Sequence, residues 1–110
     1  MHDTSFQNLL DNWNGSKAIF FEFRISLGFL RIALTSETKA GCLDIQCLDT
    51  EYICGKTRWN DCALEVQEVN DETEHGIPIN YVISDKKAGL EIRCGSLTVE
   101  ELADFNDFVY

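Results

Sequence analysis

The sequence predicts a mainly β protein, an antiparallel β meander closed as a small barrel or sandwich, with a short N-terminal helix. Three observations lead to this expectation. Apolar and polar residues alternate with a period of two in successive segments between residues 18 and 99. Single glycines and polar clusters separate these segments, as turns do. No long helical crossover lies between them, although parallel strands would need one.

The chain is expected to form a single β-rich domain that covers residues 1–110. Its 110 residues suit one domain of ordinary size. The proportions of hydrophobic residues (45%) and charged residues (25%) are those of a globular protein, which argues against disorder. No internal repeat and no linker divides the sequence, so one hydrophobic core is enough.

Helical spacing is confined to the two ends of the chain. Thr4 and Gln7 have the form of a capping box, and apolar residues follow at helical spacing, which predicts a helix over residues 5–13. Residues 100–110 fit either a short helix, with Leu102 and Phe105 inward, or the end of a strand. We expect a short C-terminal helix there.

Seven short strands are predicted between the two ends. Turns are expected at Leu27 and Gly28 and over residues 85–89, and an acidic loop is expected over residues 70–76. The apolar positions expected to face the core are Phe21, Phe23 and Ile25; Leu30, Ile32 and Leu34; Leu43, Ile45 and Cys47; Tyr52 and Cys54; Cys62, Leu64 and Val66; Ile77, Ile79, Tyr81 and Ile83; and Leu90, Ile92 and Cys94.

The five cysteines are expected to be reduced thiols, of which at least three are buried in the core. Five is an odd number, and no pair has the C-x-x-C spacing that is typical of zinc sites. A thiol on the apolar side of a strand behaves as a small hydrophobic group. The glycine-rich motifs that hold nucleotide phosphates are absent from the sequence. We therefore expect neither a metal nor a cofactor.

The charge of the chain argues against nucleic acid as a partner. Nineteen acidic residues against nine basic ones give a net charge of −10 and a pI near 4.4. The bases are dispersed, and Lys86 and Lys87 are the only adjacent pair. A phosphate-binding surface would work against this overall field. No apolar run is long enough to span a membrane, and no basic segment opens a secretory signal, so a cytoplasmic protein is expected.

A second hypothesis is a small β-barrel that binds a small molecule, or a small enzyme of unknown reaction. Its interior would use Tyr81, His75 and one or two carboxylates. A nucleophile and base could also come from His75 with Cys54 or Cys62, although a lone loop histidine and core cysteines more often have no joint role. The strongly apolar inner positions favour a filled interior, so catalysis is not expected.

The acidic loop is the main candidate for a binding site. Asp71, Glu72 and Glu74 fall at a predicted hairpin tip, where recognition residues often lie on a rigid scaffold. Trp59 is either an exposed anchor, with Arg58 beside it, or folded back onto the core, which is the expected outcome. A basic protein is the partner that such a surface would attract.

A family resemblance supports the same interpretation. The segment over residues 54–64, with its G-x-x-x-W turn, and the A-G turn before the strand at Leu90 resemble a pattern in small bacterial proteins, some of which are of the kind encoded beside toxin genes. In size and acidity the chain is also similar to immunity proteins of bacterial polymorphic-toxin systems. The resemblance implies a non-catalytic bacterial inhibitor that binds and occludes a cognate toxin. It assigns no residue.

Overall fold

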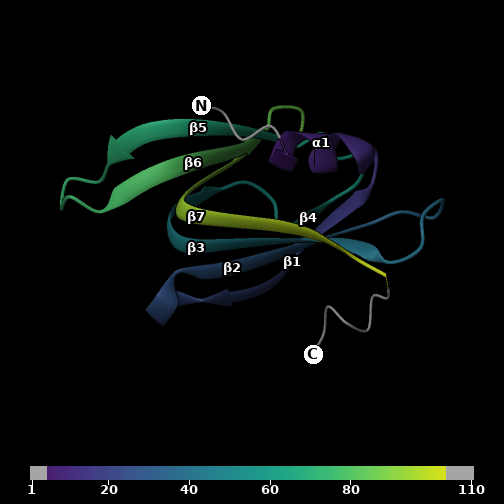
Figure 1. Cartoon of the computed structure of the whole chain (residues 1–110), viewed down its shortest axis with the longest axis horizontal. Coiled ribbons are helices and arrows are strands. Elements are labelled where there is room, and N and C mark those ends of the chain that lie inside the picture. Colours follow the sequence, from purple (N-terminus) through teal and green to yellow (C-terminus); the bar gives the residue numbers. More distant parts are fainter. Residues whose placement is uncertain (1–4, 104–110) are drawn as a thin grey trace.

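The structure is a computed structural model that describes residues 5–103 (Figure 1). These residues form one seven-stranded antiparallel sheet, in the order β4-β1-β2-β3-β7-β6-β5, with one α-helix against it. The mainly β class is therefore confirmed. The elements are α1 (Ser5–Asn12), β1 (Lys17–Arg24), the 3-10 helix η1 (Ile25–Leu27), β2 (Phe29–Thr35), β3 (Cys42–Cys54), β4 (Arg58–Trp59), β5 (Glu65–Glu72), β6 (Pro78–Asp85) and β7 (Leu90–Leu102).

The sheet is open, and its strand order is not that of a simple meander. β4 and β5 are its two edges, and within residues 5–103 no pairing joins them, so closure as a barrel is not confirmed. β1, β2 and β3 form one meander and β5, β6 and β7 another. The two meanders join because β3 and β7 pair along most of their length. Both long strands bend, which brings the β5–β6 half over the β1–β2 half (Figure 1).

The predicted N-terminal helix is confirmed as α1, and it packs against the bent sheet. Trp13, just after the helix, is 2% exposed and belongs to the main hydrophobic cluster. The Gln7 side chain donates to the carbonyl of Leu64 (3.2 Å) and accepts from the amide of Val66 (2.9 Å). It thus replaces a strand partner at the start of edge strand β5. Thr4, the predicted capping residue, lies outside the described residues.

Most of the apolar residues that were predicted to face the core are buried. The main cluster draws on both halves of the sheet and on α1, because the bend turns one side of each half inward. Tyr81 is half-buried and packs against this cluster, whereas Ile77 is exposed. The predicted core positions of β2, β3, β6 and β7 that are buried are Leu30, Ile32, Leu34, Leu43, Ile45, Cys47, Ile79, Ile83, Leu90, Ile92 and Cys94.

The predicted inward side of β1 is wrong. Ala18 is buried and Phe20 packs on the core, whereas Phe21, Phe23 and Ile25 are exposed. A bulge between Phe20 and Glu22 shifts the register of this strand against β2. One extra residue exchanges the two faces of a strand, so regular alternation across the bulge places Phe21 on the wrong side. Phe23, beyond the bulge, pairs with the buried Leu30 but is itself 46% exposed. Ile25 lies beyond the strand, in η1.

The predicted fourth strand is the second half of β3. A register shift between Thr50 and Tyr52 interrupts the alternation, and beyond it Cys54 pairs with Glu91 of β7. Tyr52 and Cys54 are both exposed, which corrects their predicted places in the core. The predicted fifth strand also begins later than expected, because β5 starts at Glu65.

The other four thiols are buried, in agreement with the expectation of at least three. All five cysteines are thiols rather than disulfides, and those that are buried are Cys42, Cys47, Cys62 and Cys94. Burial raises the pKa of the Cys62 thiol to about 11, so this group is neutral near pH 7. A neutral thiol is a poor nucleophile, in agreement with a packing role.

The prediction of a C-terminal helix is wrong for residues 100–102. These residues continue β7, where Glu100 pairs with Asp44 and Leu102 with Cys42 of β3. The rest of the predicted helix, residues 104–110, lies outside the described residues. Within residues 5–103, no helix has the length and apolar character that crossing a membrane requires.

Candidate functional site

The β5–β6 hairpin extends beyond the sheet as an arm. β6 pairs with β7 only from Tyr81 to Asp85, so the distal part of the hairpin has ladder pairs only between its own two strands. This part projects at the left of Figure 1. We call residues 69–80 the acidic arm. The predicted hairpin thus presents its tip away from the core.

A close contact at Gly95 defines the base of the acidic arm. A Cβ atom at this position would lie 3.1 Å from the Cβ of Asp49 and 3.4 Å from the carbonyl oxygen of Pro78. Glycine permits this close approach of β7 to both segments. The Asn80 side chain also donates to the carbonyl of Gly95 (2.9 Å). The arm is therefore anchored where it leaves the sheet.

Thr73 organises the tip of the arm. Its amide donates to the carbonyl of Ile77 (2.9 Å), and its hydroxyl accepts from the amides of His75 (3.3 Å) and Ile77 (3.2 Å). The amide of Gly76 closes the turn onto the carbonyl of Thr73 (2.9 Å), at a φ of +80° that favours glycine. These bonds hold the tip in one conformation, which lowers the entropy cost of binding.

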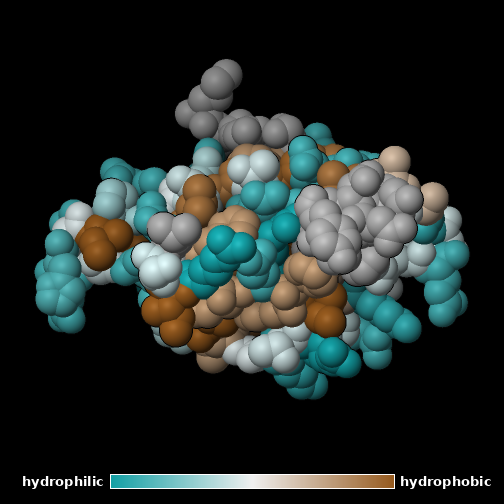
Figure 2. Space-filling model, turned by 90° about the horizontal axis from the view of Figure 1, so that it is seen from below, coloured by the Kyte–Doolittle hydropathy of each residue, from teal (hydrophilic) through white to brown (hydrophobic). Residues whose placement is uncertain are grey.

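The arm combines exposed carboxylates with an exposed apolar side chain. Asp71 and Glu72 are the last residues of β5, not loop residues as predicted, and Glu74 lies in the turn; all three are exposed. Ile77, at the end of the turn, is 39% exposed. In Figure 2 this end of the molecule, at the left, is hydrophilic at its tip, and a hydrophobic patch lies next to the tip on the side of the molecular body. No lysine or arginine occurs from residue 59 to residue 85.

A hollow of about 590 Å³ lies at the base of the acidic arm. It opens where β7 turns away from β6, and both polar and apolar groups line it. Its size suits one or two side chains of a partner that contacts the arm. The lining residues are Glu68, Val69, Asn80, Tyr81, Gly95, Ser96 and Leu97.

Arg58 and Trp59 do not lie on the arm. They form β4, the edge strand at the opposite end of the strand order from β5. Trp59 is 8% exposed, and its indole donates to Asp85 Oδ2 (2.8 Å). Trp59 is therefore folded back onto the core, as expected, and is not exposed as an anchor would be. Arg58 is exposed, but it is on a different surface from the acidic carboxylates.

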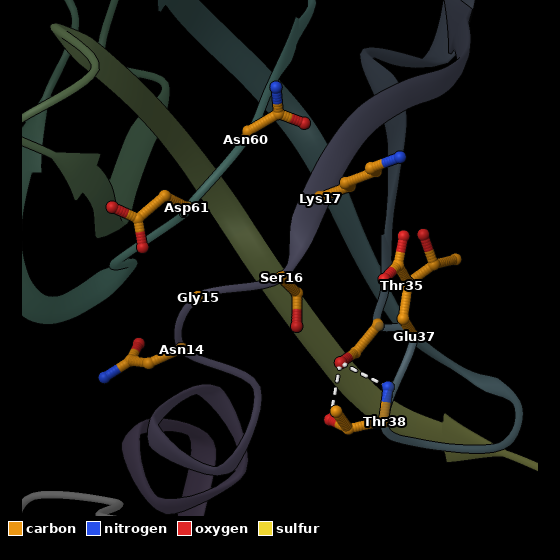
Figure 3. A pocket seen from close by; sticks show the side chains of 10 residues that line it. Asn14, Gly15, Ser16, Lys17, Thr35, Glu37, Thr38, Asn60 and Asp61 are labelled. Atoms are coloured by element: carbon orange, nitrogen blue, oxygen red, sulfur yellow. Dashed lines mark hydrogen bonds between the residues drawn. The ribbon is translucent and has the colours of Figure 1, made fainter.

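A larger pocket, of about 710 Å³, lies between the end of α1, the start of β1 and the end of β2 (Figure 3). Most of the residues that line it are polar or charged, and the Ser36 hydroxyl interacts with the amide and hydroxyl of Thr38 (3.2 and 3.0 Å). In Figure 3, the side chains of Asn14 and Asp61 point away from Lys17. Lys17 and Asp61, which carry opposite charges, therefore do not point toward each other across the pocket.

The residues of the small-molecule hypothesis do not come together. His75 is exposed at the tip of the arm, where its Nε2 lies 3.6 Å from Glu74 Oε1. Tyr81 packs edge-on against Phe6, with ring centroids 5.9 Å apart, at the other end of the arm. In the described part of the chain, no three His, Cys, Asp or Glu residues are grouped to hold a metal ion.

The comparisons with known proteins add no relative. No protein-family model, no curated protein and no solved structure matches the chain.

Sequence reasoning identified the three carboxylates of the arm but missed the groups that hold them. The Thr73-x-x-Gly76 pattern is a turn signal that could have been found, since threonine hydroxyls often accept from amides two residues ahead. The contact between Asn80 and Gly95 joins two strands far apart in sequence, and no local pattern indicates it.

Proposed function

We propose that this chain is a non-catalytic bacterial binding protein that occludes a basic protein, as an immunity-type inhibitor of a toxin does. One observation carries the proposal: the acidic arm extends beyond the sheet, and its exposed acids have no neighbouring base in the hairpin. Such a surface attracts a basic active site or groove and repels nucleic acid.

The arm has the physical features of a recognition element. Asp71, Glu72 and Glu74 supply charge that accelerates encounter with a basic partner. Ile77 supplies apolar area beside them, which charged groups alone do not. The turn around Thr73 is held by its own hydrogen bonds, so little ordering is needed on binding.

The proposed setting is the cytoplasm, and the proposed mechanism needs no cofactor. Five thiols, one of them exposed, suit a reducing compartment. The inhibitor works by covering its partner, so the chain itself makes and breaks no bond.

Site-specific photo-crosslinking in the cells that encode the chain tests this proposal. A photoreactive residue at Glu74 should capture a basic protein, because Glu74 lies at the tip of the arm. The same residue at Asn8, exposed on α1, is the matched control and should not capture it. Identical products from both positions, or no protein product from Glu74, would contradict the proposal.

A further inference from the structure

Four basic residues that are dispersed in the sequence lie together beside β4. Two adjoining hollows, of about 360 and 370 Å³, share Arg58, Trp59 and Asn60 in their walls. Lys17 lines the first hollow, and Lys56 and Lys87 line the second. We call these two hollows the cationic groove. Arg58 lines both of them.

The charge of the groove is opposite to that of the whole chain. Asp61 is the only carboxylate in its walls, and its Oδ2 lies 2.6 Å from the Nζ of Lys87. This neighbouring carboxylate raises the pKa of Lys87, so the amine stays charged. The buried carboxylate of Asp85, behind the wall, also acts on Lys87. Four cations thus outnumber two carboxylates here, in a chain where acidic residues outnumber basic ones nineteen to nine.

The groove is far enough from the acidic arm for its positive electrostatic potential to be little affected by the carboxylates of the arm. β6 begins at Pro78 in the arm and ends at Asp85, which bonds the indole of Trp59 in the groove wall. Eight residues of strand span roughly 23 Å at about 3.3 Å per residue. This length is nearly three times the Debye length of about 8 Å at physiological ionic strength. The carboxylates of the arm are therefore largely screened from the groove.

The wall of the groove is rigid where the cations are attached. The indole of Trp59 and the amides of Ala63 and Ala88 all donate to Asp85, which ties β4 to the turn that carries Lys87. Arg58 and Lys87 therefore extend from segments that the same buried carboxylate holds together. A preorganised pair of cations is a better oxyanion site than lysines on independent loops.

We propose that the cationic groove binds an oxyanion with at least two negative charges, a phosphoryl group or a polycarboxylate. The guanidinium of Arg58 would contact two of its oxygens at once, and the amines of Lys56 and Lys87 would neutralise the remaining charge. This proposal does not rest on the function proposed for the acidic arm, because it involves a different surface.

Titration of the labelled chain with inorganic pyrophosphate, and separately with citrate, tests the groove by amide NMR at low salt. Saturable shifts should be confined to the amides around Arg58 and Lys87. Arg58→Gln should weaken binding about tenfold, the loss of one charged hydrogen-bonding group. Lys56→Gln is a second variant in the groove. Lys86→Gln, exposed but outside the walls, is the matched control and should bind as the parent does.

The two ligands distinguish the two classes of oxyanion that the groove could bind. Binding of pyrophosphate alone identifies a phosphoryl ligand, binding of citrate alone a polycarboxylate, and binding of both a site for multivalent oxyanions. Absence of saturation with either ligand overturns the proposal. Equal affinity in Arg58→Gln, Lys56→Gln and Lys86→Gln, with spectra that show folded protein, also overturns it.

Discussion

Replacing Asp85 with alanine is expected to destabilise the fold by about 3 kcal/mol or more. Asp85 is 1% exposed, and its carboxylate accepts from the indole of Trp59 and from the amides of Ala63 and Ala88. Each donor that loses its acceptor in a buried site costs about 1 to 3 kcal/mol. The substitution would also release β4 from the turn after β6. Urea unfolding followed by circular dichroism measures the loss.

Asp61→Asn is the matched control for this substitution. Asp61 is an exposed aspartate paired with Lys87, and exposed ion pairs contribute about 0 to 1 kcal/mol. The account of Asp85 would be wrong if the two variants unfolded at the same urea concentration.

Replacing Arg31 with methionine is expected to cost about 3 to 5 kcal/mol, because it leaves a buried carboxylate without its cation. Asp44 is 1% exposed, and its Oδ2 lies 3.0 Å from the Arg31 guanidinium and 2.6 Å from Nε2 of Gln46. The double variant Arg31→Met with Asp44→Leu should recover much of the loss, since it removes both charges. Unfolding in urea compares the two variants.

Arg24→Met supplies the control for Arg31. Arg24 pairs with Glu22 on the surface, with 62% of its side chain exposed, so its loss should cost less than about 1 kcal/mol. A similar loss in Arg24→Met and Arg31→Met, or no recovery in the double variant, contradicts this account of the buried pair.

Local patterns predicted the elements of this fold better than their arrangement. Alternation identified the inward side of β2, because this strand contains no bulge. Hydrophobic spacing identified the inward side of α1 in the same way. In β1, the bulge after Phe20 made the same reasoning fail. The pairing of β3 with β7 joins residues about fifty positions apart, as in Ile45 with Val99. Alternation indicates which face of a strand each residue occupies, but it does not indicate which strand lies beside it.

The candidate site was predictable only where it is local in sequence. The run of acids from Asp71 to Glu74 and the hairpin that carries it are continuous, so both were expected. The anchor at Gly95 and the cationic groove arise from contacts between distant segments. The bond between Trp59 and Asp85 is such a contact, and it explains why a tryptophan in a polar segment is buried.

The association rate of the captured basic protein, measured at two salt concentrations, tests the central claim about the acidic arm. Neutralising the arm with Asp71→Asn, Glu72→Gln and Glu74→Gln should slow association at low salt about tenfold and weaken its salt dependence. Stability should change little, because exposed charges contribute little to folding. The matched control neutralises three exposed acids outside the arm, Glu37, Glu51 and Glu100, each by glutamine. Its association should remain within about twofold of the parent's, since steering by charge depends on where the charge lies. An unchanged rate and salt dependence in the arm variant, or an equal change in the control, would contradict the claim.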